Sequence, residues 1–140
     1  MRKILLILAL SALVIAGCGR KEPPQPVADS APPAIVSIEH IIAGNSLKLE
    51  ITLSGGSGGI GYQIDRAEID PYCKCPGEWR RYVEEVPSPK NFDKSSLQHL
   101  INLRSSDVAF AFRVRAVDIL GRFSEWSAPI RAQAEESFFE

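Results

Sequence analysis

The chain has 140 residues, of which 45% are hydrophobic and 24% charged, and its 16 Lys+Arg and 17 Asp+Glu leave a formal net charge of −1. This length suits one small domain, and the balanced charge excludes a general attraction to nucleic acid. The averages hide three segments of different composition, which are an apolar start, a proline-rich stretch and a longer alternating region.

The first segment has the layout of a secretory signal. Basic residues at positions 2 and 3 precede a run from Ile4 to Ile15 that carries no charge. Twelve residues rise only about 18 Å as a helix, which is well short of the ~30 Å hydrocarbon core of a membrane. The run therefore predicts a cleavable signal of residues 1–17 rather than a permanent transmembrane helix.

The end of this signal, Ile15-Ala16-Gly17-Cys18, resembles the lipobox of bacterial lipoproteins. The resemblance implies that signal peptidase II recognises Ile15, Ala16 and Gly17, and that Cys18 becomes the lipidated (palmitate-bearing) first residue. Several acyl chains anchor a protein almost permanently, whereas one does not. Because Gly19 stands where Asp favours inner-membrane retention, the resemblance implies an outer-membrane lipoprotein that faces the periplasm.

Residues 18–33 form a spacer with prolines at 23, 24, 26, 32 and 33. Such composition favours extended polyproline II, which would hold a domain about 40 Å from the bilayer. A second interpretation comes from Cys18-Gly19-Arg20-Lys21-Glu22-Pro23-Pro24, which resembles the start of the lipoproteins that mature the lipopolysaccharide-transport translocon. Glu22 replaces a Gly of that family. This resemblance implies an outer-membrane assembly helper that acts through Cys18 to Pro26.

From residue 34 the hydrophobic period changes to two. Leu47, Leu49, Ile51 and Leu53 alternate with polar residues, as in a strand with one buried face. Similar runs with turn residues between them predict seven strands, at about 35–42, 47–53, 60–69, 79–86, 97–103, 108–116 and 123–130. We therefore expect an all-β, immunoglobulin-like seven-stranded sandwich over residues 34–132, followed by a mobile tail of residues 133–140.

Three stretches indicate a particular family of β-sandwiches. Residues 110–118 (FAFRVRAVD) and 121–127 (GRFSEWS) resemble strands F and G of a fibronectin type III domain, and residues 61–67 (GYQIDRA) resemble its strand C. The resemblance spans about residues 33–132 and implies a fibronectin type III-like fold. Phe110 departs from the family, because a Tyr usually stands there.

The segment Phe123-Ser124-Glu125-Trp126-Ser127 also resembles half of the Trp-Ser-x-Trp-Ser element of cytokine-receptor modules. In those modules, arginines of strand F stack on the Trp. The resemblance implies that Arg113 and Arg115 lie along the indole of Trp126, which is a cation–π contact.

Cys73-Lys74-Cys75 contains the two thiols that remain if Cys18 carries lipid. In an oxidising compartment an even number of cysteines favours a disulfide, although residues i and i+2 of an extended strand lie about 6.6 Å apart, at the upper limit for a bridge. Free or intermolecular thiols, a thiol redox function and soft-metal binding remain alternatives.

Catalytic chemistry has little support in the sequence. His40 and His99 lie in no nucleophile or metal motif, and the Gly56–Gly61 pattern lacks the following helix that phosphate binding requires. Trp79, Arg80, Arg81 and Tyr82 form a basic-aromatic cluster, which fits either a protein-binding patch or a charged edge strand.

These patterns lead to one expected function and two alternatives. We expect a non-enzymatic envelope protein with no cofactor, no metal, no nucleic acid and no small-molecule substrate, whose sandwich binds an unidentified envelope protein. The assembly helper is the alternative, and a thiol redox or metal-handling module at Cys73 and Cys75 comes third.

Overall fold

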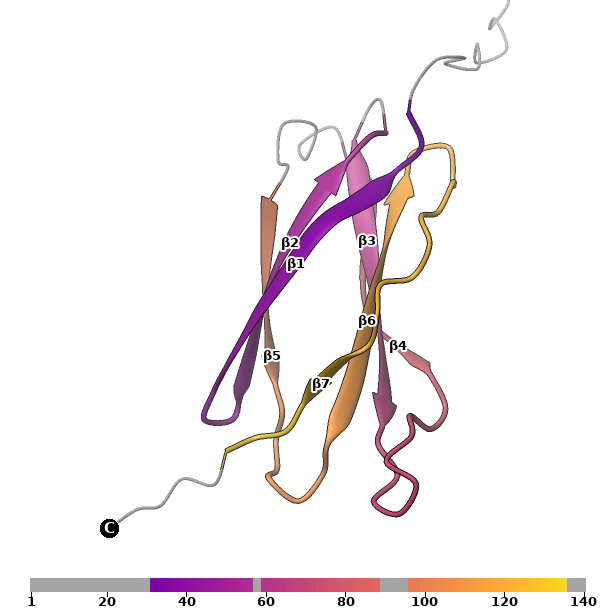
Figure 1. Ribbon diagram of the computed structural model, residues 1–140. Coiled ribbons are helices and arrows are strands. Elements are labelled where there is room, and N and C mark those ends of the chain that lie inside the picture. Colours follow the sequence, from indigo (N-terminus) through magenta and orange to yellow (C-terminus); the bar gives the residue numbers. More distant parts are fainter. Residues whose placement is uncertain (1–30, 57–58, 89–95, 136–140) are drawn as a thin grey trace, which may run out of the picture.

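The computed structural model describes residues 31–56, 59–88 and 96–135 (Figure 1). The predicted lipobox residues Ile15, Ala16, Gly17 and Cys18, together with most of the spacer, lie outside this part. The described residues form strands, turns and irregular segments, and none of their segments is a helix long and apolar enough to cross a membrane.

Seven antiparallel strands form two sheets that face each other (Figure 1). One sheet has the order β1-β2-β5 and the other the order β4-β3-β6-β7. The strands are β1 (Ala34–Ala43), β2 (Ser46–Ser54), β3 (Ile60–Glu68), β4 (Arg80–Glu85), β5 (Ser96–Asn102), β6 (Phe110–Asp118) and β7 (Ile130–Ala132). This three-plus-four arrangement confirms the predicted all-β, seven-stranded sandwich.

The core lies between the sheets and follows the predicted alternation. Leu47, Leu49 and Ile51 of β2 are fully buried against the side chains that β6 directs inward, such as Phe112 and Val114. Each fully buried side chain of this size contributes about 1.5–3 kcal/mol. A shift of β2 by one residue would direct these side chains to solvent, so the core also fixes the strand register.

The last strand differs from its prediction. Residues 123–129 run beside β6 without forming a regular strand, and β7 begins only at Ile130. Two serines replace the missing ladder: the Ser124 hydroxyl accepts the N–H of Ala116 at 2.9 Å, and the Ser127 hydroxyl accepts the N–H of Val114 at 3.0 Å. Serine hydroxyl oxygens thus accept hydrogen bonds from backbone N–H groups of β6 that would otherwise donate to the carbonyls of a neighbouring strand.

The boundary of the predicted mobile tail, residues 133–140, is wrong for its first residues. Ala134 is buried on the same face as Ala132, and the N–H of Glu135 donates to the carbonyl of Gly44 at 2.9 Å. The alternation of β7 therefore continues past its last ladder residue. The ordered domain extends to residue 135, and residues 136–140 lie outside the described part.

A charged clamp closes the end of the sandwich where the chain enters from the spacer. The buried carboxylate of Asp118 accepts the backbone N–H groups of Leu120 and Arg122 and the Nε of Arg122 at 2.6 Å. Arg122 also reaches the carbonyl of Ala31 at 3.5 Å. Desolvation acts to raise the pKa of Asp118, but these hydrogen bonds and the guanidinium charge outweigh it and hold the pKa below its usual value.

We predict that Asp118→Asn lowers the free energy of unfolding by about 1–3 kcal/mol at pH 7, because the clamp loses its charged acceptor. A folded pKa below the unfolded value means that the carboxylate stabilises the fold above about pH 4, and that this stabilisation is lost as the pH falls through the folded pKa. Urea titrations at pH 7, 5 and 3 should show the gap to the parent chain closing at pH 3. Asp107→Asn, at an exposed position, is the control; a gap that stays constant would contradict the prediction.

Candidate functional site

A row of alternating rings and guanidiniums covers the outer face of the β4-β3-β6-β7 sheet. Arg113 lies between Trp79 and Trp126, with its guanidinium carbon 4.4 and 4.2 Å from the ring centroids. Arg115 lies between Trp126 and Phe123 at 4.4 and 4.0 Å. We call Trp79, Arg113, Trp126, Arg115 and Phe123 the arginine–aromatic ladder.

The spacing of β6 explains why the ladder forms. Arg113 and Arg115 are two residues apart, so both point outward and their Cα atoms lie about 6.6 Å apart. The Trp126 ring lies close to both guanidiniums, and the hydrogen bonds of Ser124 and Ser127 to β6 hold its segment in that position. Each contact contributes about 0.5–1 kcal/mol at an exposed site and more where water is excluded.

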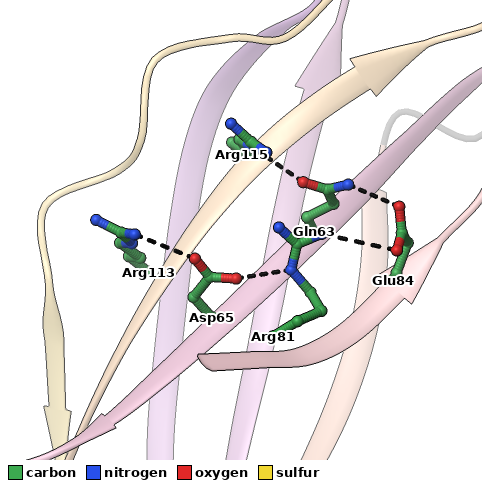
Figure 2. A network of polar contacts seen from close by, with 6 residues as sticks. All are labelled: Gln63, Asp65, Arg81, Glu84, Arg113 and Arg115. Carbon is green, nitrogen blue, oxygen red and sulfur yellow. Dashed lines mark hydrogen bonds and ion pairs between the residues drawn. The ribbon is translucent and has the colours of Figure 1, made fainter. Parts of the chain in front are cut away.

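Arg113 and Arg115 of the ladder also belong to a chain of polar contacts on this face of the sheet (Figure 2). Its centre is the carboxylate of Asp65, which accepts Arg81 Nε at 2.7 Å and Arg113 Nη2 at 3.1 Å. Asp65 is on the outer face of β3, yet only 6% of it is exposed, because the ladder covers it. A buried carboxylate with two guanidinium partners fixes the position of both arginines.

The other half of this chain is built around Gln63. Its amide oxygen accepts Arg115 Nε at 2.8 Å, and its amide nitrogen donates to Glu84 at 2.7 Å. Glu84 lies 3.7 Å from Arg81, so the six polar residues of Figure 2 are connected in one network. The orientation of the Gln63 amide follows from its neighbours, since the oxygen must face a donor and the nitrogen an acceptor.

The predicted contact of Arg113 and Arg115 with Trp126 is present, as the distances above show. The sequence patterns did not predict that the basic-aromatic cluster at residues 79–82 takes part in this contact. In the structure Trp79 completes the ladder, while Arg81 pairs with Asp65 and lies 6.0 Å from the Trp126 ring. Gln63 and Asp65 lie at outward-facing positions of β3, directly opposite two arginines of β6. The alternation of outward-facing polar residues along these two strands was the sequence signal that could have revealed the network.

The second predicted site lies at the far end of β3. Cys73 and Cys75 form a disulfide with a Cα–Cα distance of 5.2 Å, within an exposed loop between β3 and β4. The turn at Asp70 shortens the extended spacing, because the Asp70 carboxylate accepts the N–H groups of Tyr72 and Cys73 at 2.7 and 3.0 Å. These two hydrogen bonds lower the pKa of Asp70.

A third polar pair lies at the rim of the core. The Tyr62 hydroxyl and His99 Nδ1 are 3.3 Å apart, and both side chains point inward from facing sheets. Burial lowers the pKa of His99, against a smaller opposing effect of Glu85, and burial together with Glu85 raises the pKa of Tyr62. Both groups are therefore held neutral at physiological pH, which suits a core contact. The other histidine, His40, is exposed on β1 and is not part of this pair.

The groups of the ladder are hydrogen-bond donors and apolar ring faces. Its guanidiniums and indoles have N–H donors and no acceptor atom, and its rings offer flat apolar faces. Across the described residues, the structure also contains no group of three His, Cys, Asp or Glu side chains that could hold a metal ion. What the ladder offers a partner is flat apolar area beside fixed positive charge.

Comparisons with known proteins give the fold and little more. No protein-family model and no curated protein matches the chain. A solved structure of a family 76 glycoside hydrolase from a bovine Bacteroides thetaiotaomicron strain is similar, with a TM-score of 0.54 and 14% sequence identity. The similarity covers 76% of this chain but only 21% of the hydrolase, so it shows a shared fold alone.

We predict that Asp65→Ala costs about 3 kcal/mol of unfolding free energy, because Arg81 and Arg113 lose their common buried acceptor. Near-ultraviolet circular dichroism should lose tryptophan signal as the ladder loosens. The matched control is Glu78→Ala, which removes a fully solvated pair with Arg80 and should cost at most about 0.5 kcal/mol. Equal losses in urea unfolding of the two variants would contradict the central role of Asp65.

Proposed function

We propose that this chain is a non-enzymatic, lipid-anchored protein of the bacterial cell envelope, and that its fibronectin type III-like sandwich binds another envelope protein through the arginine–aromatic ladder. The ladder is the observation that carries the binding role. Trp79 and Trp126 are half-buried and 47% of Phe123 is exposed, so ring area on this face remains open to a partner.

The composition of the ladder supports a protein partner. Trp and Arg are enriched among the residues that dominate binding energy in protein interfaces. The two ladder arginines already donate hydrogen bonds to Asp65 and Gln63, so a partner would immobilise few side chains when it binds. A preordered surface of this kind loses less entropy on association than a flexible one.

Charge indicates what the partner would present. The network beneath the ladder has three guanidiniums, those of Arg81, Arg113 and Arg115, against the two carboxylates of Asp65 and Glu84. The face is thus locally positive, although the chain without residues 1–17 has 14 basic and 17 acidic side chains, a net charge of −3. A partner with apolar groups flanked by carboxylates fits this face best.

The anchor rests on the lipobox resemblance at residues 15–18. A mildly acidic domain gains no electrostatic help at an anionic membrane surface, so lipid on Cys18 would supply the attachment. The proline-rich spacer then places the sandwich in the periplasm at a distance from the membrane. An outer-membrane location is part of this proposal.

For the anchor, we predict that Cys18→Ser abolishes incorporation of radiolabelled palmitate and leaves the chain in its uncleaved form. The control is the double variant Cys73→Ser, Cys75→Ser, which should still be labelled and cleaved because neither residue follows a signal. Gel mobility and scintillation counting of the membrane fraction make the measurement. Labelling of the Cys18→Ser chain would exclude this attachment point.

For the binding face, we predict that the double variant Trp79→Ser, Phe123→Ser lowers recovery of a crosslinked envelope partner at least about tenfold, equivalent to ~1.4 kcal/mol. Full-length lipidated protein is crosslinked in its own envelope and the partner is quantified by mass spectrometry. The matched control is Ile41→Ser, Leu100→Ser, which removes two exposed side chains that flank Lys48 on the opposite sheet.

Thermal unfolding of each variant is the control for folding, and we expect both double variants to retain the fold. Equal recovery with both double variants would exclude the ladder as the binding face. If residues 1–33 alone recover lipopolysaccharide-translocon proteins as well as the full chain does, the assembly-helper function through Cys18 to Pro26 replaces this proposal.

A further inference from the structure

The loop between β3 and β4 carries a disulfide in an unusually open position. Cys73, Lys74 and Cys75 are all exposed, and 94% of the neighbouring Tyr72 is exposed. Only one residue separates the two cysteines. Closing so short a loop removes little entropy from the unfolded chain, so the bond contributes little to the stability of the fold.

The loop is held in shape by hydrogen bonds that do not involve the sulfur–sulfur bond. The N–H of Asp70 donates to the carbonyl of Cys75 at 3.0 Å, and the N–H of Lys74 donates to the carbonyl of Asp70 at 2.9 Å. At its base, Gly77 N–H donates to the Glu68 carbonyl at 2.8 Å. These contacts would keep the two sulfurs close after reduction, so the bond can open and close without refolding of the domain.

Lys74 shows that this loop is constrained around the cysteines. Its φ of 58° lies in the left-handed region, which residues other than glycine seldom adopt. Arg131, which follows the first residue of β7, donates to the Lys74 carbonyl at 3.0 Å and ties the loop to the opposite edge of the sheet. Backbone outliers of this kind are concentrated at functional sites.

The surroundings of the sulfurs differ in a way that favours one thiolate. The backbone N–H of Cys75 donates to Cys73 Sγ at 3.3 Å, and the Lys74 side chain is attached between the two cysteines. The hydrogen bond would stabilise negative charge on Cys73 alone when the bond opens, whereas the positive charge of Lys74 would favour the thiolate form of either cysteine. The nearby carboxylate of Asp70 already accepts two N–H groups and is offset by the Lys74 charge, which contributes to its lowered pKa.

The loop is also placed where another protein can reach it. A groove of about 510 Å³ lies beside it, with Pro71, Lys74, Val108, Arg131 and Gln133 among its lining residues. The chain enters the sandwich near Ala31 and β3 begins at that end, whereas the loop follows the end of β3 at the opposite pole (Figure 1). Nine strand residues span roughly 30 Å, so the disulfide faces away from the N-terminal spacer.

We propose that Cys73 and Cys75 form a thiol–disulfide exchange site that oxidises a protein dithiol. A thiolate of the partner attacks Cys75 Sγ, which forms a mixed disulfide and releases Cys73 as the stabilised thiolate. The second thiolate of the partner then attacks its own sulfur in the mixed disulfide and releases Cys75. Two electrons pass from the partner to this chain, each released thiolate takes up one of the protons that the partner thiols lost, and no other reactant is needed.

The first test uses the full-length protein in mild detergent with glutathione as the probe. We expect 5 mM reduced glutathione to open most of the bond, measured by alkylation and mass spectrometry, while the thermal unfolding midpoint stays nearly unchanged. Structural disulfides resist this reagent in a folded protein, so exposure and easy reduction go together in exchange sites. A bond that survives, or whose reduction unfolds the domain, would overturn the proposal.

The second test separates the two sulfurs. With Cys75→Ser, the remaining Cys73 keeps its backbone donor, so iodoacetamide at pH 7 should modify it about fivefold faster than Cys75 in the Cys73→Ser variant. Adding Lys74→Glu should slow the alkylation of both variants, whereas Lys74→Arg should leave both rates nearly unchanged. A peptide with two reduced cysteines should be released in oxidised form by the parent protein. Equal alkylation rates, or a peptide that stays reduced, would overturn the assignment. Neither test depends on the ladder or on its partner.

Discussion

The outer face of the larger sheet depends on one buried carboxylate. Asp65 carries its negative charge with only 6% exposure, and it does so because Arg81 and Arg113 approach from two sides. Taking such a charge out of water costs several kcal/mol, so the geometry survives only while both guanidiniums stay in place. Once Arg113 is fixed by Asp65, its guanidinium plane becomes a platform for Trp79 and Trp126, and the ladder follows from that order.

The irregular segment after β6 is a consequence of the same arrangement. A regular strand would place its backbone beside β6 along its whole length, as β7 does at Ile130–Ala132. Trp126 instead has to rise over the sheet to fill the gap between Arg113 and Arg115. Ser124 and Ser127 make this possible, because each provides both a backbone N–H and a side-chain oxygen to β6. The serines thus preserve the hydrogen bonds of β6 while the backbone follows the rings.

The sequence predicted the fold well because the fold depends on alternation. Leu47 to Leu53 and Phe110 to Ala116 show a period of two, and the first six predicted strands match β1 to β6, whereas the seventh, at 123–130, overlaps β7 only at Ile130. The prediction failed in two places where the backbone bonding does not follow from alternation. At residues 123–129, serine hydroxyls replace the backbone hydrogen bonds of a regular strand. At Ala134, a short side chain is buried after the last paired residue of β7. The contact of Trp126 with two arginines was predicted from a motif, whereas Trp79 and Asp65 were missed because their role depends on pairing between strands distant in sequence.

The two poles of the sandwich have different chemistry, and the topology explains why. Where the chain enters, Arg122 donates to the Asp118 carboxylate and to the Ala31 carbonyl, which places a charge-assisted contact at the end of a central strand. At the other pole, the loop of Cys73 and Cys75 hangs from the end of β3 and is joined to the second sheet edge through Arg131. The nine residues of β3 separate these two sites by most of the length of the sandwich (Figure 1). Under the proposed function, a tether would hold one pole and leave the exposed disulfide at the other pole accessible to a partner, while the ladder lies on the outer face of the larger sheet.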